Sequence, residues 1–228
     1  MAEVKPRLLD LFCGAGGCSV GYARAGFEVV GIDINPQPNY PYEFWRGDAV
    51  QALETLLSGG GLQKAVYGVE WDAIHASPPC QAYSLAGQIN SNSHPDLVDA
   101  TRELLGATGL PYVIENVKGA PLRDPQLLEG QMFGLNTHRP RLFETNWGYT
   151  APLLRPPPPR QTKMGRKTKP GEAMQVVGNF NGMEDAQKAM GIDWMSRKEL
   201  AQAIPPAYTQ AIGEQLMAHI QQKNPVRW

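Results

Sequence analysis

The feature that most limits the possible folds is a glycine-rich loop between two short apolar runs near the start of the chain. Residues 7–12 read RLLDLF, glycines follow at positions 14, 16 and 17, and residues 27–33 read FEVVGID. A helix is predicted between the two runs, from about residue 19 to residue 25. The order strand, glycine loop, helix, strand predicts a parallel βαβ unit, because parallel neighbours need a crossover connection.

The same alternation continues along the chain. Residues 50–57 resemble a helix, residues 72–76 form a short apolar run, residues 96–107 resemble a helix, and residues 112–117 read YVIENV. Alternating strands and helices favour an open, mostly parallel sheet with helices on both faces. We therefore predict an α/β fold in which residues 1–147 form the core that carries the functional site.

The pattern changes after Trp147. The stretch LLRPPPPRQTKMGRKTKPG contains four consecutive prolines and six basic residues, namely Arg155, Arg160, Lys163, Arg166, Lys167 and Lys169. Such a composition predicts a loop or a partly disordered arm, so residues 148–195 are set apart as a short basic segment. Residues 196–228 are expected to return to the core, because apolar residues at 208, 212, 216 and 220 predict an amphipathic helix.

Composition excludes several classes of protein. The chain has 228 residues with 42% hydrophobic residues, which suffices for one domain with a sizeable core. Three cysteines, no secretory signal and no apolar run of about 18 residues argue against a disulfide scaffold and a membrane span. We expect a cytoplasmic protein, and a net charge of −1 leaves its partners open.

The glycine loop predicts a nucleoside-containing ligand. Asp33 lies 19 residues after Gly14, which suits an acid that binds ribose hydroxyls. Ser19 stands where a dinucleotide motif has its third glycine, so a ligand with ribose and no pyrophosphate, such as S-adenosylmethionine, fits at least as well. Asp48 follows the next short run and is expected at the adenine end. The alternative is a glycine-rich turn with a purely structural role.

A second motif, HASPPCQAYS at residues 75–84, places Cys80 directly after two prolines. Each proline fixes its own φ and biases the preceding residue toward extended geometry. Cys80 is therefore expected on a rigid loop at the carboxyl end of a strand, where open α/β sheets bind their ligands. The alternative is a buried cysteine that packs as a small apolar residue.

Three further charged residues are candidates for the same site. Glu115 lies at the end of the run YVIENV, and Arg139 and Arg141 lie two apart in THRPRLFETN, which puts them on one side of an extended segment. A thiolate nucleophile needs groups that stabilise charge on its substrate, and these side chains supply them. A structural salt-bridge network is the alternative.

These motifs resemble a known family. LLDLFCGAGG, ASPPCQAYS, IENV, THRPRLFE and AIPPAYTQAIG occur in the order and rough spacing of the blocks of C5-cytosine DNA methyltransferases. The resemblance implies a Rossmann-like methyltransferase fold and S-adenosylmethionine as cofactor, with no metal. It implies cofactor contacts from Phe12, Gly14, Ala15, Gly16, Gly17, Asp33, Ile34, Asp48, Ala49, Pro79 and Ala203.

The resemblance also implies how the site works. Cys80 adds to C6 of cytosine, Glu115 donates a proton at N3, and Arg141, with Arg139 beside it, stabilises the base. Gln81, Ser84 and the six basic residues are expected to contact DNA, whose cytosine must be flipped out or single-stranded. A monomer in a prokaryotic cytoplasm is expected, and the small size is compatible with a phage gene.

The chain also departs from the family. Thr137 stands where glutamine is usual, and Gln202, Ala203 and Ile204 stand where asparagine, a small residue and valine are usual. Only about fifty residues take the place of the usual target-recognition domain. The same chemistry on RNA or a free cytosine nucleotide therefore stays open, as does a catalytically idle S-adenosylmethionine-binding module.

The nucleophile assignment makes a direct prediction. DNA containing 5-fluorocytosine should trap a covalent complex through Cys80, because the fluorine at C5 cannot leave as a proton does. Cys80→Ala should form no adduct and transfer no methyl group, yet bind cofactor as the wild type does. Peptide mapping of the adduct by mass spectrometry checks this, and an adduct on Cys13 or Cys18 would contradict it.

Overall fold

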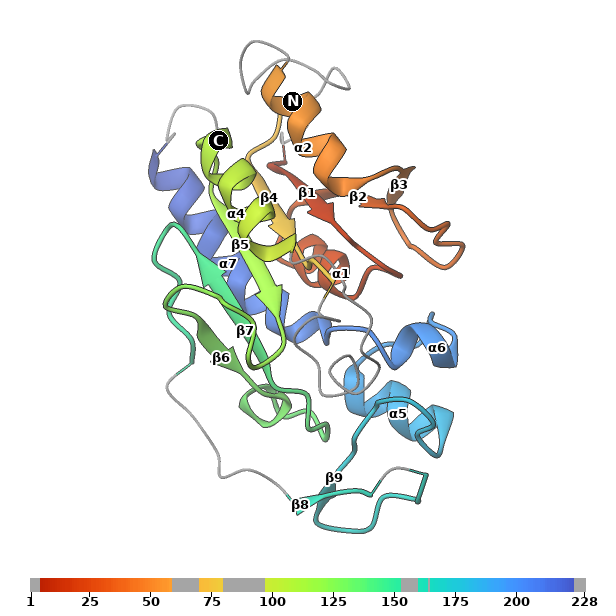
Figure 1. Cartoon of the computed structure of the whole chain (residues 1–228). Helices are drawn as coiled ribbons and strands as arrows, with labels where there is room; N and C mark the ends of the chain where they lie inside the picture. Colours follow the sequence, from red (N-terminus) through yellow and green to blue (C-terminus); the bar gives the residue numbers. More distant parts are fainter. Residues whose placement is uncertain (1–4, 59–69, 80–96, 153–159, 164, 224–228) are drawn as a thin grey trace.

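The computed structural model describes residues 5–58, 70–79, 97–152, 160–163 and 165–223, and its centre is a seven-stranded sheet (Figure 1). The strand order is β3-β2-β1-β4-β5-β7-β6. Neighbouring strands from β3 to β5 are parallel, whereas β7 runs antiparallel to β5 and β6. The predicted mostly parallel α/β sheet is confirmed. Its strands are β1 (Arg7–Leu11), β2 (Glu28–Asp33), β3 (Glu43–Arg46), β4 (Ala73–Ala76), β5 (Tyr112–Asn116), β6 (Gln126–Leu128) and β7 (Arg141–Thr145).

Helices cover both faces of this sheet. One face packs against α1 and α7, and the other against α2 and α4. The helices are α1 (Gly17–Arg24), α2 (Ala49–Ser58), α4 (Leu97–Thr108), the 3₁₀ helix η1 (Gly130–Phe133), α5 (Met183–Met190), α6 (Arg197–Leu200) and α7 (Pro206–Lys223). Within the described ranges, none of them combines the length and the apolar character that crossing a membrane requires.

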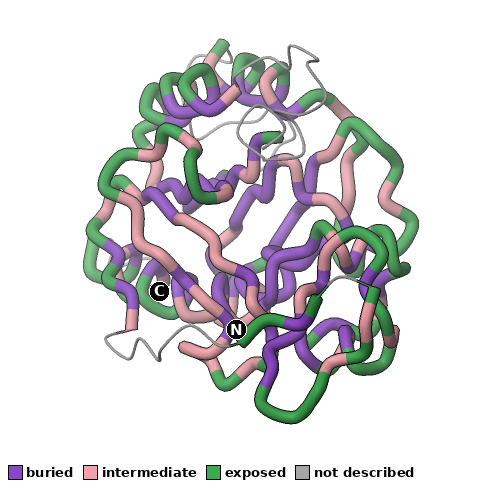
Figure 2. The backbone as a smooth tube through the Cα atoms, turned by 60° about the horizontal axis from the view of Figure 1, so that its bottom comes forward, coloured by how far each residue is buried: buried purple, intermediate pink, exposed green. Residues whose placement is uncertain are grey.

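The central strands are buried on both faces, as the tube in Figure 2 shows by its purple interior and its largely green outer turns. Side chains alternate along each strand: Leu8 lies in the cluster under α1 and α7, and Leu9 and Leu11 lie in the cluster under α2 and α4. The same alternation places Asp10, and His75 of β4, on the α1/α7 face. Strands buried on both sides read as nearly continuous apolar runs, so these two polar residues are exceptions.

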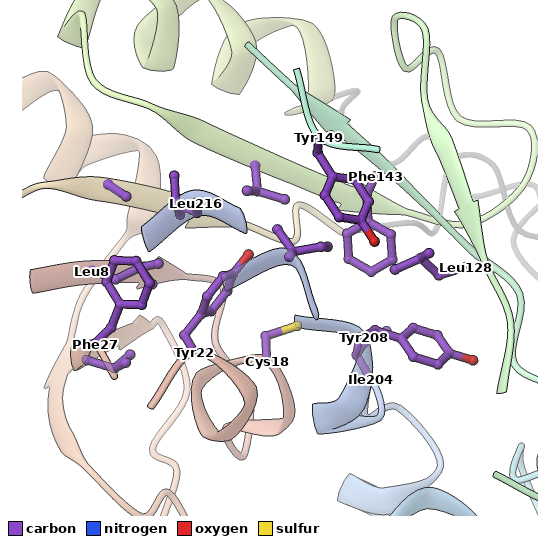
Figure 3. Packing of buried hydrophobic residues seen from close by; sticks show 14 of the residues in the cluster. Leu8, Cys18, Tyr22, Phe27, Leu128, Phe143, Tyr149, Ile204, Tyr208 and Leu216 are labelled. Carbon is purple, nitrogen blue, oxygen red and sulfur yellow. The ribbon is translucent and has the colours of Figure 1, made fainter. Parts of the chain in front are cut away.

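The predicted amphipathic helix is α7, and its apolar stripe is buried. Tyr208, Ile212, Leu216 and Ile220 all lie in the cluster shared with α1 and the sheet. Figure 3 shows Tyr22 and Cys18 of α1 near Leu216 and Tyr208 in this cluster. The side chains at intervals of four residues form one helix face, which is why the spacing alone located them.

In the part that the structure describes, the basic segment is largely loop, as its composition predicted, and it also takes part in a short two-stranded sheet. Its residues include β8 (Arg160–Gln161), which pairs in parallel with β9 (Glu172–Ala173). Arg166 donates to both carboxylate oxygens of Glu172 at 2.8 and 2.9 Å. The first acid after the basic stretch therefore pairs with one of its cations.

A small third cluster lies beyond the carboxyl ends of β4 and β5, next to β8 and β9 (Figure 1). It joins α5 and α6 to the glycine loop through one of its residues, Ala15, and to the C-terminal block through Ala203. Its other buried members are Met174, Val176, Phe180, Ala186, Ala189, Met190, Ile192, Met195 and Leu200. Residues 148–195 thus contribute a small core of their own.

The close packing of α1 on α7 predicts a large effect for one methyl group. A Cβ on Gly21 would lie 2.0 Å from Oγ1 of Thr209 and 2.2 Å from the carbonyl oxygen of Pro206. Gly21→Ala should lower the free energy of unfolding by about 1–3 kcal/mol or more, because the two helices must separate. Chemical denaturation measures this loss.

Gly106 in α4 is the matched control. A Cβ there would meet no atom of the described part of the chain within 4 Å. Gly106→Ala should leave stability unchanged or raise it by up to about 1 kcal/mol, since alanine favours helices. Equal losses in the two variants would contradict the packing argument.

Candidate active site

The glycine loop leaves β1 at the point where the strand order reverses, between β1 and β4. Phe12 and Gly14 both have positive φ, 57° and 50°, which turns the chain sharply after the strand. The amide of Gly14 donates to Oδ2 of Asp33 at 3.1 Å, and the amide of Asn35 donates to Oδ1 at 2.9 Å. The acid at the end of β2 therefore fixes the loop, at a position where open α/β sheets bind ligands.

The glycines of the loop differ in their surroundings. Among the described residues, no atom lies within 4 Å of a Cβ built on Gly14, and Ile34, directly after Asp33, is 60% exposed. By contrast, a Cβ on Gly17 would lie 2.4 Å from the carbonyl oxygen of Ile204, and one on Gly16 would press on Tyr40 and Pro41. Gly16 and Gly17 are thus needed for packing, while Gly14 and Ile34 border free space.

Two predicted cofactor residues have structural partners. Oδ1 of Asp48 accepts hydrogen bonds from the amides of Val50 and Gln51 at 2.8 and 3.1 Å, which caps α2 at its N-terminus. Ala49 is buried in the cluster under α2. The carboxylate of Asp48 is exposed, so one oxygen remains for another donor, whereas the side chain of Ala49 faces the core.

The segment after β4 is held by hydrogen bonds from two other strands. The amide of Ser77 donates to the carbonyl oxygen of Leu11 at 3.1 Å. Nδ2 of Asn116, at the end of β5, donates to the carbonyl oxygen of Pro78 at 3.0 Å. Pro79 is exposed at the end of this segment. Cys80, Gln81 and Ser84 lie outside the described residues, and their predicted roles stay predictions.

Glu115 lies on β5, next to Asn116. Its carboxyl is buried, and Oε1 lies 3.0 Å from Nε of Arg141, the first residue of β7. Burial raises the pKa of Glu115, an effect that the charges of Arg141 and Arg139 and a hydrogen bond with Ser77 partly oppose. A buried carboxyl with a raised pKa can hold a proton that it later donates.

Arg139 precedes β7, which begins at Arg141, and it makes different contacts from Arg141. The buried guanidinium of Arg139 donates to the carbonyl oxygens of Val176 and Ala201, both at 2.9 Å. Arg139 therefore ties the small third cluster to the sheet. Its charge still reaches Glu115, whose pKa it lowers.

The remaining predicted residues divide into exposed and buried ones. Arg160, Lys163, Lys167 and Lys169 are exposed, Arg166 pairs with Glu172, and Arg155 lies outside the described residues. Ala203 and Ala15 are buried in the third cluster. Thr137, at the position where the family usually has glutamine, is buried, and its hydroxyl donates to the carbonyl oxygen of Met174 at 3.1 Å.

Sequence reasoning missed one residue that touches the glycine loop. Nε1 of Trp194, between α5 and α6, donates to the carbonyl oxygen of Ala15 at 2.9 Å. Nothing in the sequence connects two residues so far apart. Among the described residues, no cluster of three or more His, Cys, Asp or Glu side chains is arranged to hold a metal ion.

A second missed group lies beneath the loop. Asp10 accepts a hydrogen bond from the hydroxyl of Ser19, and the hydroxyl of Tyr40 lies 2.8 Å from the same Ser19 oxygen. Burial raises the pKa of Asp10 to about 7, although the Ser19 hydrogen bond lowers it. The only feature of the sequence that could have pointed to this group is the acid Asp10 inside an otherwise apolar strand.

Comparison with known proteins agrees with this arrangement. The model of the family described as C-5 cytosine-specific DNA methylase matches residues 6–128, more than half of the chain. The chain therefore belongs to this family, as its motifs suggested.

Two relatives illustrate the match in sequence. The chain is 37% identical over 84 residues to the Type II methyltransferase M1.HphI of Haemophilus parahaemolyticus, covering 36% of this chain and 23% of that protein. It is 30% identical over 130 residues to M.AquIA of a Picosynechococcus species, covering 51% and 50%. The matches thus span about a quarter to a half of the length of these relatives.

The solved structure supports the fold. A protein of E. coli described as a prophage-encoded DNA modification methyltransferase superimposes with a TM-score of 0.65 at 13% identity. The match covers 95% of this chain and 100% of that one. The Rossmann-like fold expected from the motifs is confirmed.

The buried Asp10 predicts an unusual dependence of stability on pH. In the unfolded chain this carboxyl ionises near its ordinary pKa of 3.8, but in the folded protein only near 7. Raising the pH from about 4 to about 7 therefore favours unfolding, by about 1.4 kcal/mol for each unit between the two pKa values. Asp10→Asn should remove this loss while keeping an acceptor for Ser19.

Denaturant unfolding at a series of pH values measures the difference between wild type and Asp10→Asn. Ser19→Ala should extend the loss to higher pH, because the hydroxyl that lowers the folded-state pKa is gone while the unfolded-state pKa is unchanged. Parallel pH curves for wild type and Asp10→Asn would contradict the assignment.

Proposed function

We propose that this chain methylates cytosine at C5 in DNA, using S-adenosylmethionine. The observation that carries the proposal is a contact between two motifs. Asn116 donates to the carbonyl oxygen of Pro78, two residues before Cys80, while its neighbour Glu115 pairs with Arg141. A thiol that adds to a base and an acid that protonates the same base must be held at a fixed separation, and contacts of this kind hold them. Membership of the C-5 cytosine-specific DNA methylase family supports the same reading.

The open side of the glycine loop fits the proposed cofactor. Asp33 uses each carboxylate oxygen once, for Gly14 and Asn35, and each oxygen retains a lone pair for a ribose hydroxyl. Ile34 offers an exposed apolar surface for an adenine ring, and Asp48 retains a free oxygen near the start of α2. When bound, S-adenosylmethionine supplies an electrophilic methyl group. Phe12 and Pro79 would border the same site.

The residues of the chain then make the cytosine ring reactive. The Cys80 thiolate adds at C6 and forms a carbon–sulfur bond, which turns C5 into an enamine-like nucleophile. Glu115, protonated, donates its proton to N3 and so neutralises the charge that the addition creates. Arg141 stabilises negative charge on the ring. Once C5 carries the methyl group, the C5 proton is lost to water, the carbon–sulfur bond to Cys80 breaks, and N3 returns its proton to Glu115, which restores the aromatic base.

The exposed cations of the basic segment would supply phosphate contacts. Arg160, Lys163, Lys167 and Lys169 are exposed and belong to the segment around β8 and β9. In Figure 1, β8 and β9 lie beyond the carboxyl end of β5, the strand that carries Glu115 as its last residue but one. Phosphate contacts position a nucleic acid without reading its sequence. Arg166 contributes less, because its charge is matched by Glu172.

Transfer of a labelled methyl group tests the function. Tritiated S-adenosylmethionine is incubated with duplex DNA, single-stranded DNA, RNA and dCMP, and the product is digested to identify 5-methylcytosine. Label in DNA is expected with the wild type and absent with Cys80→Ala. Glu115→Gln should retain cofactor binding and lose most transfer.

Other outcomes separate the rival readings. Label in RNA or dCMP alone would replace DNA as the substrate while retaining the chemistry. Cofactor binding without label in any of the four substrates would identify a binding module and refute the enzymatic proposal.

A further inference from the structure

The peptide group between Ala15 and Gly16 is the part of the glycine loop that a distant segment holds in place. The amide of Gly16 donates to the carbonyl oxygen of Cys13 at 3.1 Å, and the carbonyl oxygen of Ala15 accepts from Nε1 of Trp194 at 2.9 Å. Both polar ends of this peptide group are therefore paired. One partner lies in the loop itself, and the other lies in the connection between α5 and α6 (Figure 1).

The carbonyl group of Ala15 depends on this partner. Helix α1 does not supply one, because its hydrogen bonds begin with the amide of Val20, which donates to the carbonyl oxygen of Gly16 at 3.0 Å. Ala15 is buried in the small third cluster. A buried carbonyl without a partner is unfavourable, so the indole N–H of Trp194 stabilises this conformation of the loop.

The glycines of the loop make such a bond necessary. Rotation of the peptide group between Ala15 and Gly16 changes ψ of Ala15 and φ of Gly16. Gly16 has a φ of 85°, and glycine adopts positive and negative φ with similar ease. The backbone alone therefore opposes this rotation weakly. The bonds to Cys13 and Trp194 oppose it at the two ends of the peptide group.

Trp194 is itself held by its surroundings. The residues Ile192 and Met195, which lie close to it in the chain, are both buried in the third cluster. Oε2 of Glu199, on α6, accepts a hydrogen bond of 2.8 Å from Nδ2 of Asn39, in the segment after β2. The connection between α5 and α6 is thus attached to the rest of the molecule near both of its ends. A donor held in this way can fix the group to which it donates.

We propose that Trp194 is a positioning residue for cofactor binding: its indole N–H keeps the glycine loop in one conformation before S-adenosylmethionine binds. The proposal rests on the proposed function, in which this loop binds the cofactor. A loop that is already ordered loses less conformational entropy on binding, so the affinity for the ligand rises. Residues 148–195, which take the place of a recognition domain, then serve the cofactor site as well.

The test removes the indole N–H and keeps an aromatic ring. Trp194→Phe is the first variant. The second carries a benzothiophene analogue of tryptophan at position 194, introduced by amber suppression, in which sulfur replaces the N–H and the bicyclic shape is kept. This analogue carries the test if Trp194→Phe does not fold. Hydrogen exchange of the Gly16 amide is measured by NMR without cofactor, and the Kd of S-adenosylmethionine is measured by calorimetry.

Both variants should loosen the loop and weaken cofactor binding. The Gly16 amide should exchange faster than in the wild type, and the Kd should rise about fivefold to tenfold, as expected for one lost hydrogen bond. The KM for the cofactor should rise by a similar factor, whereas kcat at saturating cofactor should change less than twofold. A general loss of structure would not separate KM from kcat in this way.

Ile192→Val is the matched control. It removes one buried methylene group from the cluster that contains Ala15 and leaves the indole bond in place. This variant should lose thermal stability, because a small cavity forms in the cluster. Its Gly16 exchange and its cofactor Kd should stay within a factor of two of the wild-type values.

The outcomes distinguish the two proposals. Unchanged Gly16 exchange in the two Trp194 variants, or faster exchange with an unchanged Kd, would overturn the positioning role, as would equal effects in Ile192→Val. The expected rise in Kd in a protein that methylates no cytosine substrate would support the positioning role and refute the proposed function. A wild type that binds no S-adenosylmethionine would refute both.

Discussion

The packing of α1 against α7 is the constraint on which the rest of the molecule depends. α1 follows the glycine loop directly, and α7 comes from the end of the chain, so this contact brings together residues that are up to 191 positions apart, as in the bond from Thr209 to the carbonyl oxygen of Cys18. The helices approach closely because Gly21 and Gly213 have no side chains. Together they close the face of the sheet that carries Asp10 and His75, and they exclude the water that would otherwise solvate those groups.

That exclusion determines the electrostatics of the site. Burial raises the pKa values of Asp10 and Glu115 and lowers that of His75, so all three favour their neutral forms. Arg141 and the hydroxyls of Ser19 and Ser77 moderate these shifts by stabilising charge. Burial therefore disfavours charge on all three groups, and in the described part the positive charges that oppose this effect at Glu115 are those of Arg141 and Arg139.

Local patterns in the sequence predicted much of the fold. Features that depend on spacing within one segment can be read directly from a sequence. They include the glycine loop, the acid at Asp33, the strand containing Glu115 and the buried stripe of α7. The partners of Arg139 and Trp194 are backbone carbonyls from distant segments, and no spacing predicts such contacts. β8 and β9 escaped notice because two-residue strands carry almost no periodic signal. In the sequence, His75 looked like any residue of a buried strand, because its hydrogen bonds with Tyr22 and Ser77 are visible only in the structure.

The hydrogen bond from Asn116 to the carbonyl oxygen of Pro78 has a mechanical consequence. The last residue pair between β4 and β5 is Ala76 with Ile114, so this bond extends their connection two residues beyond the ladder. The bond resists sliding of the two strands past each other at their carboxyl ends, where the proposed catalytic residues lie. Thermal motion of the sheet then displaces the Glu115 backbone and the Pro78 turn together, as a common translation. A common translation leaves unchanged the separation between these two anchoring points.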